Sequence, residues 1–313
     1  MEVLYFLESI RTPVVTEFMS AATYLGSQFL FLGLAIVIFW CIGKRQAYFL
    51  FVVCLAGTIV SQWLKLIFCI PRPWVLDPNF SIVESAREMA SGYSFPSGHT
   101  QAAVGAFGCI ALTAKRRWVR VVCVIIILIV PFSRMYLGVH TPLDVGVAFL
   151  CAVALLAIFW PCFKSEKRFR ASMKPVLAVL CVLAIAFTLW VNLHAFPENV
   201  DAENLLDGMK NAWTLLGCTL GLAVSYLVDE KWLHFEVKAP LPGQILKVVL
   251  GLLLLLGVLQ GLKMLFLAIA GGALWTNIIR YFLAVVFACC IWPATFPFFA
   301  KFGASKTEEG TAA

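Results

Sequence analysis

The sequence predicts an all-α integral membrane protein, a polytopic helical bundle with about nine transmembrane spans. The chain of 313 residues is 62% hydrophobic and only 13% charged, whereas soluble domains average about 45–50% apolar and about 25% charged residues. Its apolar residues fall in runs of about 17–25, long enough to cross a hydrocarbon core of about 30 Å. The net charge of +7 comes from basic residues in short segments between these runs, which argues for membrane orientation and against nucleic-acid binding.

The apolar runs place the elements in order along the chain. Residues 1–20 have a loosely helical apolar pattern, which predicts a short helix on the membrane surface. The second span should end at Pro71-Arg72-Pro73, because proline cannot continue a helix. The predicted spans are 24–42, 47–69, 97–114, 119–135, 142–162, 175–193 and 211–228, followed by two spans within 244–299 that divide at Gly271-Gly272.

These spans suggest two regions, residues 1–163 with the surface helix and a catalytic core, and residues 164–313 with the later spans and a short tail. Most Lys and Arg residues, such as Lys115–Arg117, fall on one side of this topology, and the positive-inside bias puts that side in the cytoplasm. The N-terminus is then expected outside. The ends of the second and fourth spans and the starts of the third and fifth should therefore meet at the outer face.

Three polar motifs lie at those span ends, where lipid-facing sequence would not tolerate them. They are Lys65 with Arg72-Pro73, then Pro96-Ser97-Gly98-His99, then Ser133-Arg134 with His140 and Asp144. Lysine and arginine supply permanent positive charge, and arginine can clamp two phosphate oxygens at once. A helix start adds unpaired backbone N–H groups that favour an anion. The motifs together predict a phosphate-handling active site.

The third motif carries the expected nucleophile. A carboxylate bonded to one imidazole nitrogen fixes the tautomer and leaves the other nitrogen free to attack phosphorus. We therefore expect His140 as nucleophile, Asp144 as its orienting partner, and His99 as acid and then as base on water. The expected phosphate-binding residues are Lys65, Arg72, Ser97, Gly98 and Arg134, with Pro73, Pro96 and Ser133 in support. Nothing in this scheme requires a metal or another cofactor.

Each motif taken alone also has a purely structural interpretation. Pro96–His99 could be a turn and a helix cap, and Lys65 could extend its ammonium group to the interface. Asp144 could belong to a capping box with Thr141, with Pro142 at the first helical position. The catalytic interpretation is favoured because all the motifs fall on one expected membrane face.

Together the motifs resemble the signature of the type 2 phosphatidic acid phosphatase superfamily, over about residues 60–150, and every motif position matches. That superfamily includes lipid phosphate phosphatases, bacterial phosphatidylglycerophosphate and undecaprenyl pyrophosphate phosphatases, glucose-6-phosphatase and vanadium haloperoxidases. The resemblance implies a phosphohistidine intermediate on His140, metal independence and inhibition by vanadate. It says nothing about the second half of the chain.

The expected function is an integral membrane phosphatase for lipid phosphates or diphosphates, with apolar side chains in the 74–95 loop available to cover a lipid headgroup. A phosphatase for a soluble sugar phosphate is the first alternative. A haloperoxidase that holds vanadate and a non-enzymatic lipid transporter or scaffold are the others. The expected partners are the lipid substrate and membrane lipids, not nucleic acid, and the oligomeric state stays open. The expected location is a bacterial plasma membrane, with the site on the periplasmic or extracellular face.

Overall fold

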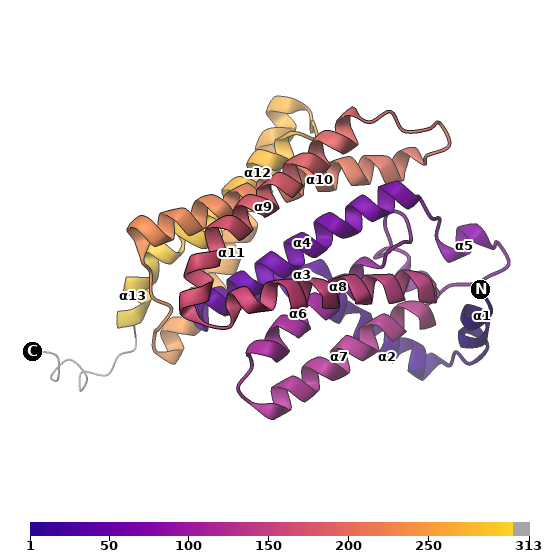
Figure 1. The fold of residues 1–313 in the computed structure, drawn as a ribbon, viewed down its shortest axis with the longest axis horizontal. Coiled ribbons are helices and arrows are strands. Elements are labelled where there is room, and N and C mark those ends of the chain that lie inside the picture. Colours follow the sequence, from indigo (N-terminus) through magenta and orange to yellow (C-terminus); the bar gives the residue numbers. More distant parts are fainter. Residues whose placement is uncertain (303–313) are drawn as a thin grey trace, which may run out of the picture.

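The structure is a computed structural model that describes residues 1–302, which form helices joined by turns and loops. The long helices lie broadly along one axis of the molecule, with α4 near its centre (Figure 1). The α-helices are α1 (Glu2–Ser9), α2 (Pro13–Thr23), α3 (Gln28–Cys41), α4 (Lys44–Phe68), α5 (Pro73–Leu76), α6 (Gly98–Thr113), α7 (Arg117–Tyr136), α8 (Pro142–Phe163), α9 (Glu166–Leu193), α10 (Ala202–Val228), α11 (Leu241–Ala270), α12 (Thr276–Val286) and α13 (Phe296–Lys301). The predicted all-α membrane bundle is confirmed.

Within residues 1–302, seven helical segments are long and apolar enough to cross a membrane. An eighth is possible if Pro13–Gly26 and Gln28–Cys41, which meet at a bend of 50°, form one broken span. The predicted third span is α6, whose 16 residues are fewer than the roughly 20 that a hydrocarbon core requires. Length and composition therefore support fewer crossings than the sequence suggested.

The predicted single surface helix over residues 1–20 is wrong. The structure has two helices there, because Thr12-Pro13 is a strong start signal: the Thr12 side chain accepts a hydrogen bond from the Val15 N–H, and Pro13 occupies the first turn. Helices α9 and α10 likewise begin well before the predicted 175 and 211. Their first turns are polar and are capped by Ser165 and Asp201, so a search for apolar runs does not detect them.

The division of the last apolar stretch is as predicted. Helix α11 ends at Ala270, and Gly271 and Gly272 follow with φ values of +59° and +79°. Only glycine adopts this left-handed backbone readily, so the pair ends the helix and turns the chain into α12. Most of the predicted tail, residues 303–313, lies beyond the described residues.

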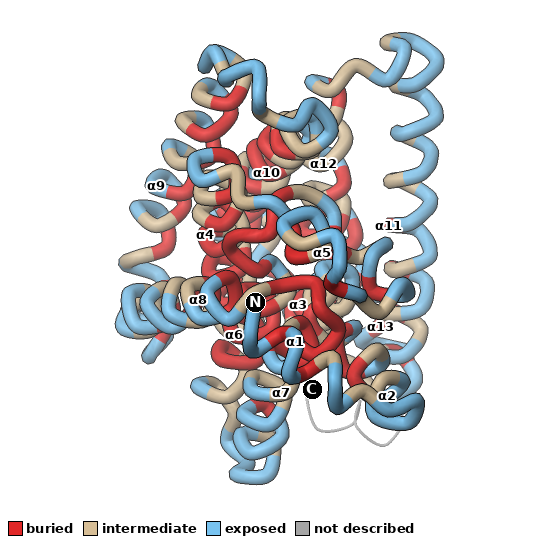
Figure 2. The backbone as a smooth tube through the Cα atoms, turned by 90° about the vertical axis from the view of Figure 1, so that its right-hand side faces the viewer, coloured by how far each residue is buried: buried red, intermediate tan, exposed pale blue. Residues whose placement is uncertain are grey.

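The core is centred on α4, which packs against α6, α8, α9 and α10. Helices of the second predicted region therefore pack directly on those of the first. Figure 2 shows α4 and α10 largely buried, while α11 is exposed along most of its length. The carboxyl end of α4 lies near α5 and α1 at one end of the bundle, and α13 lies at the opposite end (Figure 1).

Candidate functional site

The three motifs are brought to one end of the bundle by the up-and-down order of the helices. Lys65 is in the last turn of α4 and Arg134 is in the last turn of α7. Ser97 caps the start of α6 and Thr141 caps the start of α8. Because consecutive long helices run in opposite directions, these ends and starts share one face, as the sequence predicted.

Arg72 connects the first motif to the third. Its Nη1 lies 2.9 Å from Nε2 of His140 and donates to the Val139 carbonyl at 3.0 Å. Its Nε and Nη2 donate to the carbonyls of Gly92 and Ser91, at 3.0 and 2.7 Å. The same Nη1 lies 3.4 Å from Nδ1 of His140, so the guanidinium group is close to both ring nitrogens and faces the imidazole ring. The nitrogen expected to attack therefore lies directly beside a cation.

The carboxylate of Asp144 is held by two short hydrogen bonds. Its Oδ2 accepts from the hydroxyl of Ser94 at 2.6 Å and from the N–H of Thr141 at 2.7 Å. The Asp144 N–H donates back to the Thr141 hydroxyl at 3.2 Å, which completes the predicted capping box. The expected direct bond to His140 is not formed, because Oδ2 lies 3.6 Å from Nδ1, beyond hydrogen-bond range.

Ser94 is a residue of the site that sequence reasoning missed. It is fully buried, and its hydroxyl lies 3.5 Å from Nδ1 of His140 while it donates to Asp144. In the sequence it is one serine among several polar loop residues, three positions before Ser97. The available signal was its closeness to the second motif, but only the folded loop brings its hydroxyl to the carboxylate.

The second motif forms the start of α6. The Ser97 hydroxyl accepts from the N–H and the hydroxyl of Thr100, at 3.4 and 3.0 Å, and its own N–H donates to the Asp144 carbonyl at 3.1 Å. Ser97 therefore acts mainly as a cap that ties the second motif to the third. Gly98 is exposed, with open space where a Cβ would project. Nε2 of His99 is buried and has no partner within residues 1–302.

Two further cations are buried at the site. Arg134 is fully buried, and its Nη1 donates to the Thr23 hydroxyl at 2.8 Å, whereas its Nε and Nη2 have no partner in the described part of the chain. Lys65 is also buried and donates to the Tyr93 carbonyl. Leaving buried charged donors unpaired is costly, so an anion is the partner that this arrangement favours.

The surroundings keep the imidazole of His140 neutral. This residue lies in the turn between α7 and α8, and burial lowers its pKa well below the ordinary value. The positive charges of Arg72, Arg134, Lys65 and His99 lower that pKa further. A neutral imidazole among cations suited to a tetrahedral anion can perform nucleophilic attack on phosphorus.

The N-terminal residues close one side of the site, which no local pattern had indicated. A Cβ on Gly26 would lie 2.7 Å from Cγ1 of Val130 and 2.9 Å from the carbonyl oxygen of His99. Arg11 donates through Nε to the Tyr136 carbonyl at 3.0 Å. Glycine is therefore required for α6 and α7 to approach the turn after α2.

The residues predicted to give support have simpler positions. Pro73 and Pro96 are buried, Pro73 at the first position of α5. The Ser133 hydroxyl donates to the Val130 carbonyl of its own helix at 2.7 Å. Over the described residues, no three His, Cys, Asp or Glu side chains group as metal ligands. Metal independence stays a prediction.

Comparison with known families gives two matches along the chain. The sequence model of the PAP2 superfamily matches residues 45–168. A second one, described as the transmembrane extension of PAP2 superfamily phosphatases, matches residues 213–305. The expectation that the likeness stops near residue 150 is therefore wrong, because the later helices also carry a family pattern. Sequence reasoning missed it because those helices carry no polar motif.

Two curated relatives are similar to parts of the chain. Undecaprenyl-diphosphatase BcrC of Bacillus subtilis (strain 168) is 27% identical over 132 residues, which are 41% of this chain and 65% of that protein. Phosphatidylglycerophosphatase B of the same organism is 27% identical over 182 residues, 51% of this chain and 81% of that protein. The matched part of this chain thus covers just under two thirds of the length of the first relative. No solved structure matches it significantly.

Proposed function

We propose that this chain, which belongs to the PAP2 superfamily, is an integral membrane phosphatase for lipid phosphates or diphosphates. The observation that carries the proposal is the 2.9 Å contact between Arg72 and Nε2 of the buried His140. Two donors of Arg134 in the same site, which have no partner within residues 1–302, add to it. The names of the two relatives, a lipid diphosphatase and a lipid phosphate phosphatase, support the lipid substrate.

In the proposed reaction, Nε2 of His140 attacks phosphorus and a covalent phosphohistidine forms. The bond from phosphorus to the lipid oxygen breaks, and His99 delivers a proton to that leaving oxygen. In the second step a water molecule attacks the phosphohistidine while His99 takes a proton from it. Inorganic phosphate leaves, and both histidines return to their starting states.

The other residues hold the anion and the nucleophile in place. Lys65, Arg72 and Arg134 would neutralise the nonbridging oxygens, whose charge must be stabilised as the phosphoryl group transfers. The backbone N–H groups at Gly98, at the positive end of α6, would add to this field. Asp144 would stabilise the Nδ1–H of His140 as the imidazole becomes positive.

We further propose that the site faces the periplasm or the cell exterior of a bacterial plasma membrane. The basic turn Lys115–Arg117 follows the far end of α6, so it lies at the end of the bundle away from the site. Basic loops remain in the cytoplasm, which supports the outer face for His140. The two relatives come from a bacterium.

The test is phosphate release by the purified full chain from undecaprenyl diphosphate, phosphatidylglycerophosphate, phosphatidic acid and glucose 6-phosphate. We expect release from at least one lipid, retained in EDTA and inhibited by vanadate. His140→Ala should abolish it and prevent acid-labile labelling of the protein by phosphate. His194→Ala is the matched control, because His194 is exposed and stacks on Trp190. No release from any lipid, or full activity of His140→Ala, would refute the proposal, and a clear preference for glucose 6-phosphate would favour the soluble substrate.

A further inference from the structure

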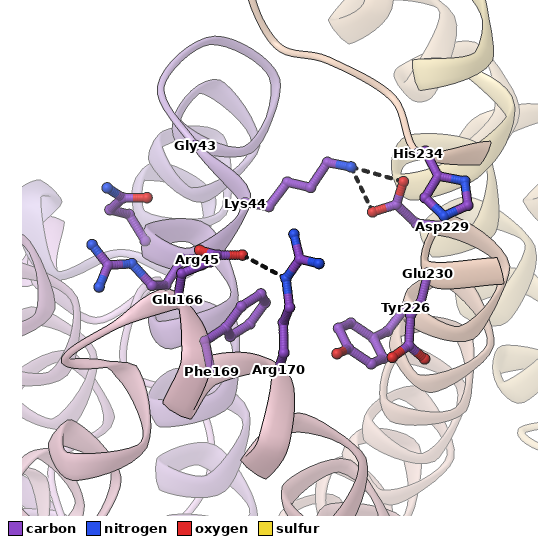
Figure 3. Close-up of a pocket in the computed structure, with 11 residues that line it drawn as sticks. Gly43, Lys44, Arg45, Glu166, Phe169, Arg170, Tyr226, Asp229, Glu230 and His234 are labelled. Atoms are coloured by element: carbon purple, nitrogen blue, oxygen red, sulfur yellow. Dashed lines mark hydrogen bonds and ion pairs between the residues drawn. The ribbon is translucent and has the colours of Figure 1, made fainter. Parts of the chain in front are cut away.

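A polar cavity lies beside each end of α4. The larger one, with a volume of about 410 Å³, is at the amino end, between α4, α9 and α10 (Figure 3). Its carboxylates are paired with neighbouring cations, as Asp229 is with Lys44 and Glu166 with Arg170. The smaller cavity adjoins Lys65 at the carboxyl end of α4, in the candidate active site. This smaller cavity shows how α10 reaches the site.

Three consecutive backbone carbonyls hold two of the buried cations of the site. Arg72 donates from Nη2 to the Ser91 carbonyl at 2.7 Å and from Nε to the Gly92 carbonyl at 3.0 Å. Lys65 donates to the carbonyl of Tyr93, the next residue. We call these three carbonyl-bearing residues the carbonyl strip. Because both cations are buried, the position of the strip determines where their charged groups point.

The strip is fixed by contacts that do not involve the two cations. Gly92 has a φ of +69°, a left-handed conformation that glycine adopts readily. The N–H of Ser94, just after the strip, donates to the Ile70 carbonyl at 2.8 Å. The side chain of Tyr93 is buried, and its hydroxyl accepts from the N–H of Asp201 at 3.0 Å. Asp201 caps α10, so the strip is tied to a helix that begins 108 positions later.

The start of α10 also faces the strip across the smaller cavity. The polar lining of this cavity comes from the strip, from Gln62 and Lys65 of α4, and from Asn204, Asp207 and Asn211 of α10. The spacing of the three α10 residues puts them on one face of the helix. The cavity has a volume of about 20 Å³, which is room for about one water molecule. A phosphate group does not fit there, so this face of α10 acts on Lys65 and the strip rather than on the substrate.

Helix α10 approaches α4 closely at the same level. A Cβ on Gly208 would lie 2.7 Å from Cδ1 of Leu66, the residue after Lys65. The start of α10 therefore packs on α4 and bonds to the strip at once, and it supports both cations from the side away from the substrate. Misplacing a binding group by about 1 Å can lower a reaction rate about 100-fold, so this support matters for phosphate binding.

We propose that Tyr93 is a positioning residue for the phosphate clamp, which is formed by Lys65 and Arg72. Its hydroxyl ties the carbonyl strip to α10, and the strip directs the two cations toward the phosphate. The inference rests on the proposed function, because that function gives the clamp a phosphate to bind. It assigns to α10, which carries no polar motif of its own, a role in the active site.

The experiment uses the full chain in detergent. Steady-state kinetics on the lipid substrate give kcat and KM, and orthovanadate, a phosphate analogue, is titrated without substrate while the thermal unfolding midpoint is followed. The test variant is Tyr93→Phe, which keeps the ring and removes the hydroxyl. The matched control is Tyr48→Phe, because Tyr48 is equally buried and its hydroxyl has no partner within residues 1–302.

Tyr93→Phe should bind vanadate about fivefold more weakly than the wild type, the effect of losing one neutral hydrogen bond. KM should rise by a similar factor, with kcat within about twofold, because the clamp binds the phosphate oxygens before and during the reaction. Tyr48→Phe should match the wild type in both assays. A loss of folded protein alone would lower kcat and the midpoint and would leave KM and vanadate affinity unchanged.

A second pair of variants changes the strip itself. Gly92 and Gly271 both have positive φ values, +69° and +59°, and both have no atom within 4 Å of an added Cβ. Alanine should therefore cause similar backbone strain at the two positions. Only Gly92→Ala should weaken vanadate binding, because only Gly92 belongs to the strip. Gly92→Asn should restore part of the affinity, since asparagine tolerates the left-handed conformation better.

The outcomes separate this inference from the proposed function. Wild-type KM and vanadate affinity in Tyr93→Phe would overturn the positioning role and leave the proposed function intact. Equal losses in Tyr48→Phe or Gly271→Ala would also overturn it, because the effect would then be global. If the wild type bound vanadate but hydrolysed no lipid, the proposed function would be refuted, while weaker vanadate binding by Tyr93→Phe would still support the positioning role. A wild type that binds no vanadate would overturn both.

Discussion

The hydroxyl of Ser94 donates to Oδ2 of Asp144 over 2.6 Å and lies 3.5 Å from Nδ1 of His140. The carboxylate oxygen itself is 3.6 Å from that nitrogen. Ser94 therefore sits beside both members of the pair and fixes the position of the carboxylate. We regard Ser94 as a positioning residue that acts on His140 through Asp144.

Ser94→Ala should lower kcat about 10- to 100-fold with little change in KM, because a hydrogen bond to a charged group is lost. Without the hydroxyl, the negative charge of Asp144 is less compensated, so the pKa of His140 should rise. The acid limb of kcat/KM should then move to higher pH, and Ser94→Thr should restore part of the activity. Steady-state kinetics across pH checks this.

The control for that substitution is Ser91→Ala. Ser91 is in the same loop, but only its backbone carbonyl binds Arg72, and alanine keeps that group. A Ser94→Ala enzyme with the kinetics and pH profile of Ser91→Ala would show that Ser94 has no positioning role.

The lowered pKa of His140 makes a prediction about stability. The folded state holds this imidazole neutral, while the same imidazole in the unfolded chain titrates near pH 6.5. Below about pH 6.5 the unfolded state binds more protons at His140 than the folded state does. The free energy of unfolding should therefore decrease as the pH is lowered. Above about pH 6.5, His140 should make no contribution to the pH dependence of the free energy of unfolding. The thermal unfolding midpoint in detergent, measured from pH 8 to pH 5, tests this.

His140→Asn removes the titrating group from both states. The midpoint of this variant should therefore decline less steeply below about pH 6.5 than that of the wild type. Parallel curves over the whole range would mean that His140 is protonated equally in both states.

Gly26→Ala should reduce the free energy of unfolding by about 1–3 kcal/mol, the usual cost of overpacking. The added Cβ would meet the backbone oxygen of His99 at 2.9 Å, and a backbone atom cannot rotate away. Activity should also fall, because His99 must shift. Gly33→Ala is the control, with no atom within 4 Å of the new Cβ. Equal midpoints for the two variants would contradict this packing.

Gly217→Ala should separate α10 from α12 and lower the unfolding midpoint. The new Cβ would lie 2.4 Å from the carbonyl oxygen of Ile278, a larger conflict than at Gly26, so a loss of about 3 kcal/mol is expected. Gly257→Ala on α11 meets nothing within 4 Å and should be neutral or slightly stabilising. Thermal unfolding of both variants provides the measurement, and an unchanged Gly217→Ala midpoint would refute the close contact.

The sequence by itself determined the class of the protein and indicated most residues of the candidate site, although not Ser94. Apolar runs report membrane helices because each backbone polar group in lipid must be paired within its own segment. The end of α11 at Gly271 and the capping box of Thr141 and Asp144 could likewise be predicted. Both depend on neighbours within a few positions. The starts of α9 and α10 were predicted too late in the chain, because the first turns of these helices are polar.

Only the tertiary structure decided which groups touch. Ser94 and Asp144 are separated by 50 positions, and Thr23 and Arg134 by 111. No local pattern encodes such pairs, because they depend on how whole helices pack. The same holds for the pocket between α4, α9 and α10. The hydropathy pattern and the motifs indicate the fold class and the reactive side chains, whereas helix packing sets the distances between those side chains.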